Sequence, residues 1–312
     1  MELFKRKTCK YQNVIVRVFL LSLFLAGCNL AKLNNEENLA YIERIKKWHN
    51  ERIENLKSKD GWLNLVGLFW LAEGENKMGS DSSNNFILSP DKAPPFVASF
   101  LLENNKVKIK ICEGIEVYHK DSLVKGMSLE SDERGNPTVL DMGSLSWFII
   151  KRGEKIGIRL RDYESPLISQ FKGIETFPVD SAWRIEANFE SYETPKTISM
   201  SNVIGTINEY PSPGVLVFQI KGVIYKLYPF SNDGDLFIIF GDETSAVETY
   251  GGGRFLSVKK PNKDGKTFID FNKAYNPPCT FTEFATCPLP PRQNRLPVRI
   301  TAGEKKVEQL NH

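Results

Sequence analysis

Two spacings of hydrophobic positions divide the chain. From Glu36 to about Lys57, apolar side chains recur every three to four positions among Lys, Arg and Glu, and Asp60-Gly61 ends the pattern. This spacing predicts an amphipathic helix, because residues three and four apart lie on one face of an α-helix. The apolar stripe comprises Leu39, Ile42, Ile45, Trp48, Ile53 and Leu56.

The chain beyond this helix has the pattern of short β-strands. Turn residues such as Asn104-Asn105 and Lys221-Gly222 separate runs rich in Val, Ile and Phe. Hairpins closed by such turns form antiparallel sheets, and strands do not alternate with long helices as in a parallel sheet. We therefore expect a mainly β protein whose antiparallel sheets form a barrel or a sandwich. The expected strands are Leu63–Leu71, Phe96–Leu102, Val107–Cys112, Leu145–Ile150, Lys155–Leu160, Trp183–Phe189, Val215–Ile220, Val223–Tyr228, Leu236–Phe240 and Phe255–Val258.

A run of 28 residues near the C-terminus, DFNKAYNPPCTFTEFATCPLPPRQNRLP (270–297), has no period. Its six prolines restrict the backbone to extended or turn conformations, which predicts a stiff C-terminal strap across the domain. Cys279 and Cys287 are expected to form a disulfide across the strap, and two free packed thiols are the alternative. The apolar stretch Val298–Ile300 is a candidate for one more strand.

The first residues predict an exported lipoprotein. Five basic residues precede an apolar run from Val18 to Ala26, which is too short to span a bilayer. The run ends in Leu25-Ala26-Gly27-Cys28, which resembles a bacterial lipobox, and a plain signal peptide is the alternative. We expect lipid on Cys28 to anchor an extracytoplasmic protein to a bacterial membrane, with the outer membrane as the expected site in the cell envelope.

The charge of the chain is dominated by this first segment. The net charge is +3, from 41 basic and 38 acidic residues, and residues 1–28 contribute +4, so the remainder carries 3 − 4 = −1. Such a balance does not indicate a nucleic-acid partner. The expected organisation is a signal peptide (1–27), a lipidated Cys with tether and helix (28–58), a single β domain (59–304) and a polar tail (305–312), although the length also suits two small β domains.

Candidate chemistry rests on arginine, carboxylate, Tyr and Asn side chains, because the chain has only three histidines and lacks HExxH, CxxC and GxSxG motifs. Arginines bind carboxylates or phosphates, and carboxylates bind hard cations or transfer protons. An internal salt-bridge network is the alternative role. No metal site or cofactor is indicated. The candidate ligand-binding or catalytic residues are Arg159, Asp162, Asp242, Thr244, Tyr250, Arg254, Asp270, Asn272, Tyr275, Asn276 and Arg295.

Several segments resemble the bacterial and archaeal family called domain of unknown function 1684. They are GWLNLVGLFWLAEGEN (61–76), RLRDYESP (159–166), FKGIETFPVD (171–180), GDETSAVETYGGGRFL (241–256) and DFNKAYNPPC with CPLPPRQNRLPVRITAGE (270–304). The resemblance implies a shared fold but no reaction and no established catalytic residue.

Three functions follow as hypotheses. The first is an envelope lipoprotein that binds a small molecule in a β-barrel pocket, with an anionic or an amphipathic ligand as the two options. The second is a carboxylate- or metal-dependent hydrolase, with Cys279 as a nucleophile in one variant. The third is a structural or assembly lipoprotein with exposed apolar patches. Binding ranks first because it requires the fewest special residues.

Overall fold

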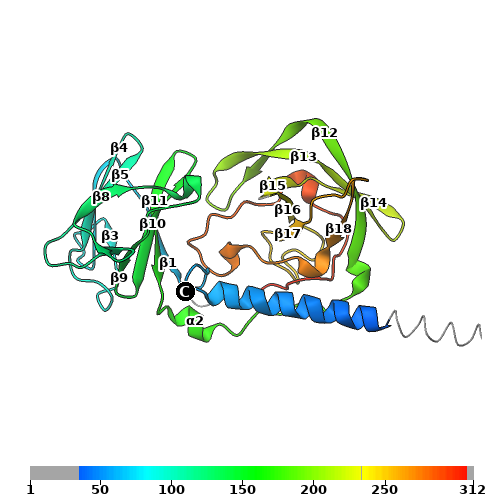
Figure 1. Cartoon of the computed structure of the whole chain (residues 1–312), viewed down its shortest axis with the longest axis horizontal. Coiled ribbons are helices and arrows are strands. Elements are labelled where there is room, and N and C mark those ends of the chain that lie inside the picture. Colours follow the sequence, from blue (N-terminus) through cyan, green and yellow to red (C-terminus); the bar gives the residue numbers. More distant parts are fainter. Residues whose placement is uncertain (1–34, 233, 308–312) are drawn as a thin grey trace, which may run out of the picture.

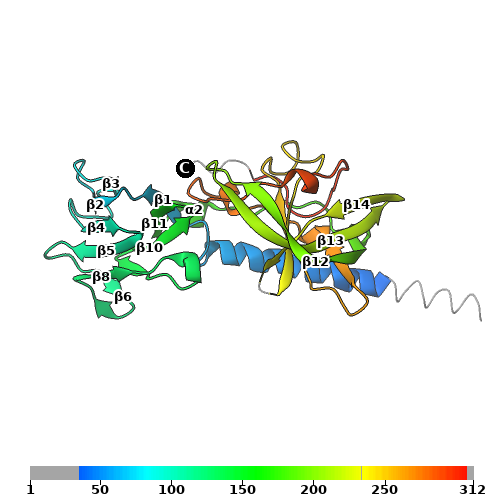
Figure 2. The same ribbon diagram turned by 90° about the horizontal axis from the view of Figure 1, so that it is seen from above.

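The computed structural model of the chain describes residues 35–232 and 234–307, with β-strands as the main element. The predicted mainly β, antiparallel fold with an N-terminal helix is confirmed. Two groups of strands lie side by side, and the helix runs beneath the second group (Figures 1 and 2). We call them the N-terminal lobe (65–162) and the C-terminal lobe (184–304). The predicted signal peptide, the lipobox and Cys28 lie outside the described residues.

The N-terminal lobe consists of two sheets around one core. Alternating burial along β5 (Lys106–Ile111), with the lysines exposed and Val and Ile buried, is typical of a strand with one face on the core. One sheet has the order β1-β11-β10-β9-β6-β7 and the other the order β3-β2-β4-β5-β8. The other strands are β1 (Leu65–Trp70), β2 (Gly74–Gly79), β3 (Phe86–Ile87), β4 (Ala98–Glu103), β6 (Tyr118–His119), β7 (Ser122–Leu123), β8 (Gly126–Leu129), β9 (Leu140–Met142), β10 (Leu145–Arg152) and β11 (Lys155–Asp162), with η1 (Asp132–Arg134).

The C-terminal lobe is built on two long antiparallel strands, β12 (Arg184–Ser201) and β13 (Ile207–Ile220). Its sheets have the orders β14-β13-β12-β18 and β15-β16-β17. A separate core gathers side chains such as Leu216, Phe218 and Phe271. The single domain expected over 59–304 stays a prediction, and the described residues within it contain more than one core. The other elements are α2 (Pro166–Gln170), η2 (Ser181–Trp183), β14 (Val223–Leu227), β15 (Phe230–Asn232), β16 (Asp235–Phe240), β17 (Arg254–Val258) and β18 (Lys266–Asp270).

The predicted N-terminal helix covers 35–57 and packs against the C-terminal lobe. Ile45 and Leu56 of the predicted stripe are buried, but Leu39 is exposed. Tyr41 is buried in addition and donates a hydrogen bond to Asp270 Oδ1 at 2.8 Å. Within residues 35–232 and 234–307, no helix has both the length and the hydrophobicity that a membrane span requires.

The segment after β18 is irregular but well packed. It contains η3 (Phe271–Lys273), η4 (Pro278–Thr280) and η5 (Arg292–Asn294), and its apolar side chains, such as Phe281, are buried. The expected strap is therefore not confirmed. The expected strand at Val298–Ile300 is wrong, because the N–H and C=O of Ile300 bond to the side chains of Asp242 and Arg254 and not to a neighbouring strand.

The expected Cys279–Cys287 disulfide is absent, and both residues are free cysteines. Instead of a covalent bond, the Cys279 backbone N–H donates a hydrogen bond to Cys287 Sγ at 3.1 Å. The alternative from the sequence, two free packed thiols, describes this part of the structure.

Candidate functional site

The structure separates the candidate residues instead of gathering them in one cavity. Asp242, Thr244 and Arg254 form a buried network, whereas Asp270 and Tyr275 line hollows beside the N-terminal helix. The remaining candidates lie elsewhere. Asn272 is buried and bonds to Asp270, and the Asn276 N–H donates to Glu304. Arg159 and Tyr250 lie near Cys279 and Cys287, Asp162 pairs with Lys92, and Arg295 is exposed next to Gly241.

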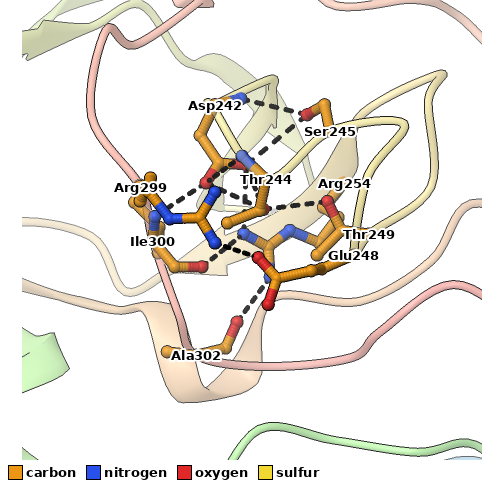
Figure 3. A network of polar contacts seen from close by, with 9 residues as sticks. All are labelled: Asp242, Thr244, Ser245, Glu248, Thr249, Arg254, Arg299, Ile300 and Ala302. Atoms are coloured by element: carbon orange, nitrogen blue, oxygen red, sulfur yellow. Dashed lines mark hydrogen bonds and ion pairs between the residues drawn. The ribbon is translucent and has the colours of Figure 1, made fainter.

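Asp242 and Arg254 belong to a network of polar contacts (Figure 3). The Asp242 and Arg254 side chains are 0% and 1% exposed, and Arg254 Nη2 lies 3.3 Å from Asp242 Oδ1. Asp242 also accepts hydrogen bonds from the Thr244 hydroxyl at 2.9 Å and from the Ile300 N–H at 2.7 Å. Arg254 donates to the carbonyls of Ile300 and Ala302. The pair therefore joins the loop before β17 to residues 300–302, which is the structural role that the sequence left open.

The glycine run Gly251-Gly252-Gly253 forms the tight corner that precedes this network. Gly253 has a φ of +84°, and a Cβ there would lie 2.6 Å from the Phe240 carbonyl oxygen and 2.3 Å from Pro290 Cγ. The position therefore requires glycine. It directly precedes β17 and sets Arg254 at its first position, so the run serves packing here.

Two hollows lined by polar and charged side chains lie along the N-terminal helix. They have volumes of about 610 and 760 Å³. The helix residues on their walls fall on one face and extend from Glu37 to Asn55, a length of about 27 Å at 1.5 Å per residue. The first hollow is lined by Glu37, Asn38, Tyr41, Arg44, Ile45, Ser181, Arg184, Asp270 and Lys273. The second is lined by Trp48, Glu51, Arg52, Asn55, Arg184, Asp235, Ser257, Lys259, Thr267, Phe268, Asp270, Lys273 and Tyr275. We call the two together the helix groove.

Arg184, Asp270 and Lys273 belong to both hollows and mark the middle of the groove. Arg184 and Asp270 are opposite residues on β12 and β18. The Arg184 guanidinium lies 3.7 Å from the centre of the Phe268 ring. Among the described residues, neither Arg184 nor Lys273 forms an ion pair, so two cations at the centre of the groove lack a carboxylate partner.

The Asp270 carboxylate is positioned by hydrogen bonds from Tyr41 and Asn272. Its Oδ1 accepts hydrogen bonds from the Tyr41 hydroxyl at 2.8 Å and from the Asn272 N–H at 3.2 Å. The Asn272 side-chain amide donates to Tyr41 Oη at 2.9 Å. Burial, followed by the hydrogen bond to Asp270, raises the pKa of Tyr41, which keeps it protonated as a donor. In the described part of the chain Asp270 Oδ2 has no bonded partner, so one acceptor remains for a ligand.

The far end of the groove is fixed by Arg52 of the helix. Arg52 Nε donates to Glu304 at 2.5 Å, Arg52 Nη2 donates to the Asn276 carbonyl at 2.8 Å, and the guanidinium lies 4.3 Å from the Tyr275 ring centre. Glu304 is fully buried, and burial raises the pKa of its carboxyl group although the Arg52 charge opposes this. Arg52 thereby anchors the helix to the end of the C-terminal lobe.

Sequence reasoning missed Arg184, Lys273, Arg52 and Tyr41 in this site. The three cations resemble solvent-exposed charges in the sequence, and Tyr41 lies beside the apolar stripe that was predicted. The polar positions on the buried side of the helix were the available signal. No group of three or more His, Cys, Asp or Glu side chains suited to a metal ion lies together in the region from 35 to 307 that the structure describes.

Fold and site together define a two-lobed, mainly β protein with a charged groove between its N-terminal helix and the C-terminal lobe. The family model described as protein of unknown function (DUF1684) matches residues 169–305, and the chain belongs to this family. The match covers the C-terminal lobe and includes 171–180, 241–256 and 270–304 of the predicted resemblance, whereas 61–76 and 159–166 lie outside it.

A solved structure shares sequence with part of the chain. It is the solution NMR structure of an uncharacterized protein of Haloarcula marismortui, with 31% identity, coverage of 46% of this chain and 80% of that chain, and a TM-score of 0.38. A search of curated proteins found no match.

Proposed function

We propose that this protein is an envelope lipoprotein that binds a small organic anion in the helix groove. The observation that carries the proposal is the pair Arg184 and Lys273, which line both hollows without an ion-pair partner among the described residues. A guanidinium binds a carboxylate or phosphate through two parallel hydrogen bonds, and an ammonium adds a point charge.

The ligand class is narrowed by the acidic and aromatic groups of the groove. Asp270 Oδ2 is free to accept a hydrogen bond, so the ligand carries a hydroxyl group near its acidic group. Trp48 and Phe268 supply apolar faces in the second hollow. Hydroxy acids, sugar acids and sugar phosphates have this combination of an anion, a hydroxyl and a small carbon skeleton.

This proposal places the ligand in the helix groove, whereas the sequence-based hypothesis placed it in a β-barrel pocket. Of the acids considered for hydrolysis, Asp242 is enclosed in the network of Figure 3, where its oxygens bond to protein groups. Asp270, in contrast, reaches the groove. The geometry therefore favours binding over a hydrolase centred on Asp242.

Calorimetric titration of the purified chain with a panel of hydroxy acids, sugar acids and sugar phosphates tests the proposal. We expect at least one anion to bind, and R184Q and K273Q each to weaken it about tenfold or more, because a charged hydrogen bond contributes about 1.5–3 kcal/mol. K266Q is the matched control, since Lys266 on the neighbouring strand β18 pairs with Glu186 and does not line the groove. Binding that survives both groove substitutions, or a panel without any binder, refutes the site.

Anchoring is tested separately in cells. Replacement of Cys28 by Ser is expected to abolish incorporation of labelled palmitate and to release the chain from the membrane fraction. Retention of the label by C28S would contradict the lipoprotein part without affecting the groove.

A further inference from the structure

A buried arginine lies on the face of β11 that is turned away from the N-terminal core. Ile158 and Leu160 belong to that core, so Arg159 between them points to the other face. Arg159 is only 5% exposed, and its guanidinium lies 5.3 Å from the Trp62 ring centre. Its Nε is buried without a partner, and among the described residues the side chain forms no hydrogen bond and no ion pair.

Buried charges are normally paired, because desolvation of an isolated charge is costly. The neighbouring charges do not provide a partner. Asp132 is bound by Arg152, with 2.7 Å between Asp132 Oδ2 and Arg152 Nη2, and Arg161 pairs with Asp60. Burial, followed by the charge of Arg152, lowers the pKa of Arg159 to about 10. The remaining interaction that favours the charged form of Arg159 is with Cys287, one member of a pair of cysteines.

Cys287 and Cys279 form a dithiol pair that faces this arginine from the C-terminal lobe. Both pack in one cluster with Trp62, which also lies under Arg159. The Tyr250 hydroxyl donates to Cys279 Sγ at 3.5 Å. Cys287 is 4% exposed, whereas Cys279 is partly exposed. The more accessible thiol is therefore Cys279, with the buried thiol behind it.

The hydrogen bonds of the pair favour a single thiolate. The hydrogen bond from Cys287, and then the one from Tyr250, hold the pKa of Cys279 below its usual value, and burial opposes them. The same shared proton raises the pKa of Cys287. The negative charge of the pair and the positive charge of Arg159 compensate each other only while the cysteines are reduced, because a disulfide is neutral.

We propose that Cys279 and Cys287 are a redox-active dithiol that undergoes exchange with external disulfides, and that Arg159 is a positioning residue that stabilises its reduced form. The proposal is independent of the helix groove. Thiolates stabilised by nearby positive charge make the corresponding disulfide easier to reduce.

The exchange is balanced in two steps. The Cys279 thiolate attacks one sulfur of an external disulfide RSSR, a mixed disulfide forms, and RS⁻ leaves and takes a proton from solvent. Cys287 then loses its proton to solvent and attacks Cys279 Sγ, so the second RS⁻ leaves and is protonated. Overall the thiolate–thiol pair loses two electrons and one proton, and RSSR gains two electrons and two protons, the second proton coming from solvent, to become two RSH.

The test uses the full chain in detergent micelles with Cys9, Cys28 and Cys112 replaced by Ser, so that only the pair remains. The protein is equilibrated at pH 8 with mixtures of oxidised and reduced glutathione, quenched with acid, and labelled with a maleimide that shifts its gel mobility. We expect a reversible intramolecular disulfide that is lost in C279S and in C287S. A pair that stays reduced in every mixture, or that forms only intermolecular bonds, overturns the proposal.

Arg159 distinguishes a tuned dithiol from an ordinary one. In R159M the disulfide is expected to become about tenfold harder to reduce, since one pKa unit of lost thiolate stabilisation corresponds to a factor of ten. R159K retains the charge and is expected to remain within about threefold of the parent. R161M is the matched control on the same strand and is expected to change the ratio less than twofold. A shift below twofold in R159M overturns the role of Arg159.

A second measurement covers the case in which R159M does not fold. The rate of alkylation of the parent pair by iodoacetamide is followed against pH. We expect its midpoint below the pKa of about 8.5 of a free cysteine. A midpoint at or above that value contradicts a stabilised thiolate.

Discussion

The buried Asp242–Arg254 pair provides the sharpest test of how the C-terminal lobe is held together. Replacement of Arg254 by Met preserves most of the side-chain volume but removes the cation and the donors to Ile300 O, Ala302 O and Asp242. Asp242 then remains as a buried carboxylate without a positive partner.

The size of the effect follows from burial. Both side chains are at most 1% exposed, and removal of one partner of a buried pair costs about 3–5 kcal/mol. At about 2–4 °C per kcal/mol for a protein of this size, the Tm is expected to fall by roughly 6–20 °C. K259M is the matched control, because Lys259 and Asp235 form a pair with an exposed lysine, which contributes at most about 1 kcal/mol.

Urea denaturation followed by circular dichroism measures these changes, and hydrogen exchange of residues 242–256 and 298–304 places them in the structure. The double variant D242N/R254M is expected to be more stable than R254M, because it removes the unpaired charge. If R254M unfolds within 1 kcal/mol of the parent, or if the double variant is less stable than R254M, the pair does not hold these segments together.

Two further predictions concern the helix that covers the groove. R52M leaves the buried Glu304 without its ion-pair partner, so we expect a loss of about 3 kcal/mol in the free energy of unfolding and limited proteolysis within residues 35–57. K46M, at an exposed i,i+3 pair, is expected to leave the cleavage pattern unchanged. Burial lowers the pKa of His49 below 6.5, so the contribution of His49 to stability is present above pH 6.5 and is lost as the pH falls below that value. The difference in unfolding free energy between the parent and H49N is therefore expected to shrink from pH 7.5 to 5.5. A constant difference contradicts this prediction.

Strands with their own hydrophobic pattern were predictable from the sequence. β5 alternates Lys with Val and Ile, and β10 contains the apolar run WFII (147–150). β2 (GENKMG) and the second half of β12 (SYETPKTISMS) were not recognised, because their residues are mostly polar and their pairing comes from the neighbouring strands. Their strand conformation is a property of the sheet and not of the segment.

The groove was harder to predict than the fold. The choice of residues by chemical type identified Asp270 and Tyr275, which line the groove. It also selected Asp242 and Arg254, which form a buried ion pair with each other. Arg184 counts as a site residue because no carboxylate pairs with it among the described residues, and the sequence alone does not show which charges are paired. Tyr41 and Asp270, which meet in the groove, are 229 residues apart.

The contact between Arg52 and Glu304 has a consequence for the order of folding. The two residues are 252 positions apart, so at a synthesis rate of about 5–20 residues per second the helix is made roughly 13–50 s before its anchor. During that interval the inner side of the helix, with Ile45 and Leu56, has no C-terminal lobe to cover it. The N-terminal lobe, whose core closes within residues 78–160, has time to form first. We therefore expect the helix groove, which depends on the contact between Arg52 and Glu304, to close only after residue 304 has been made.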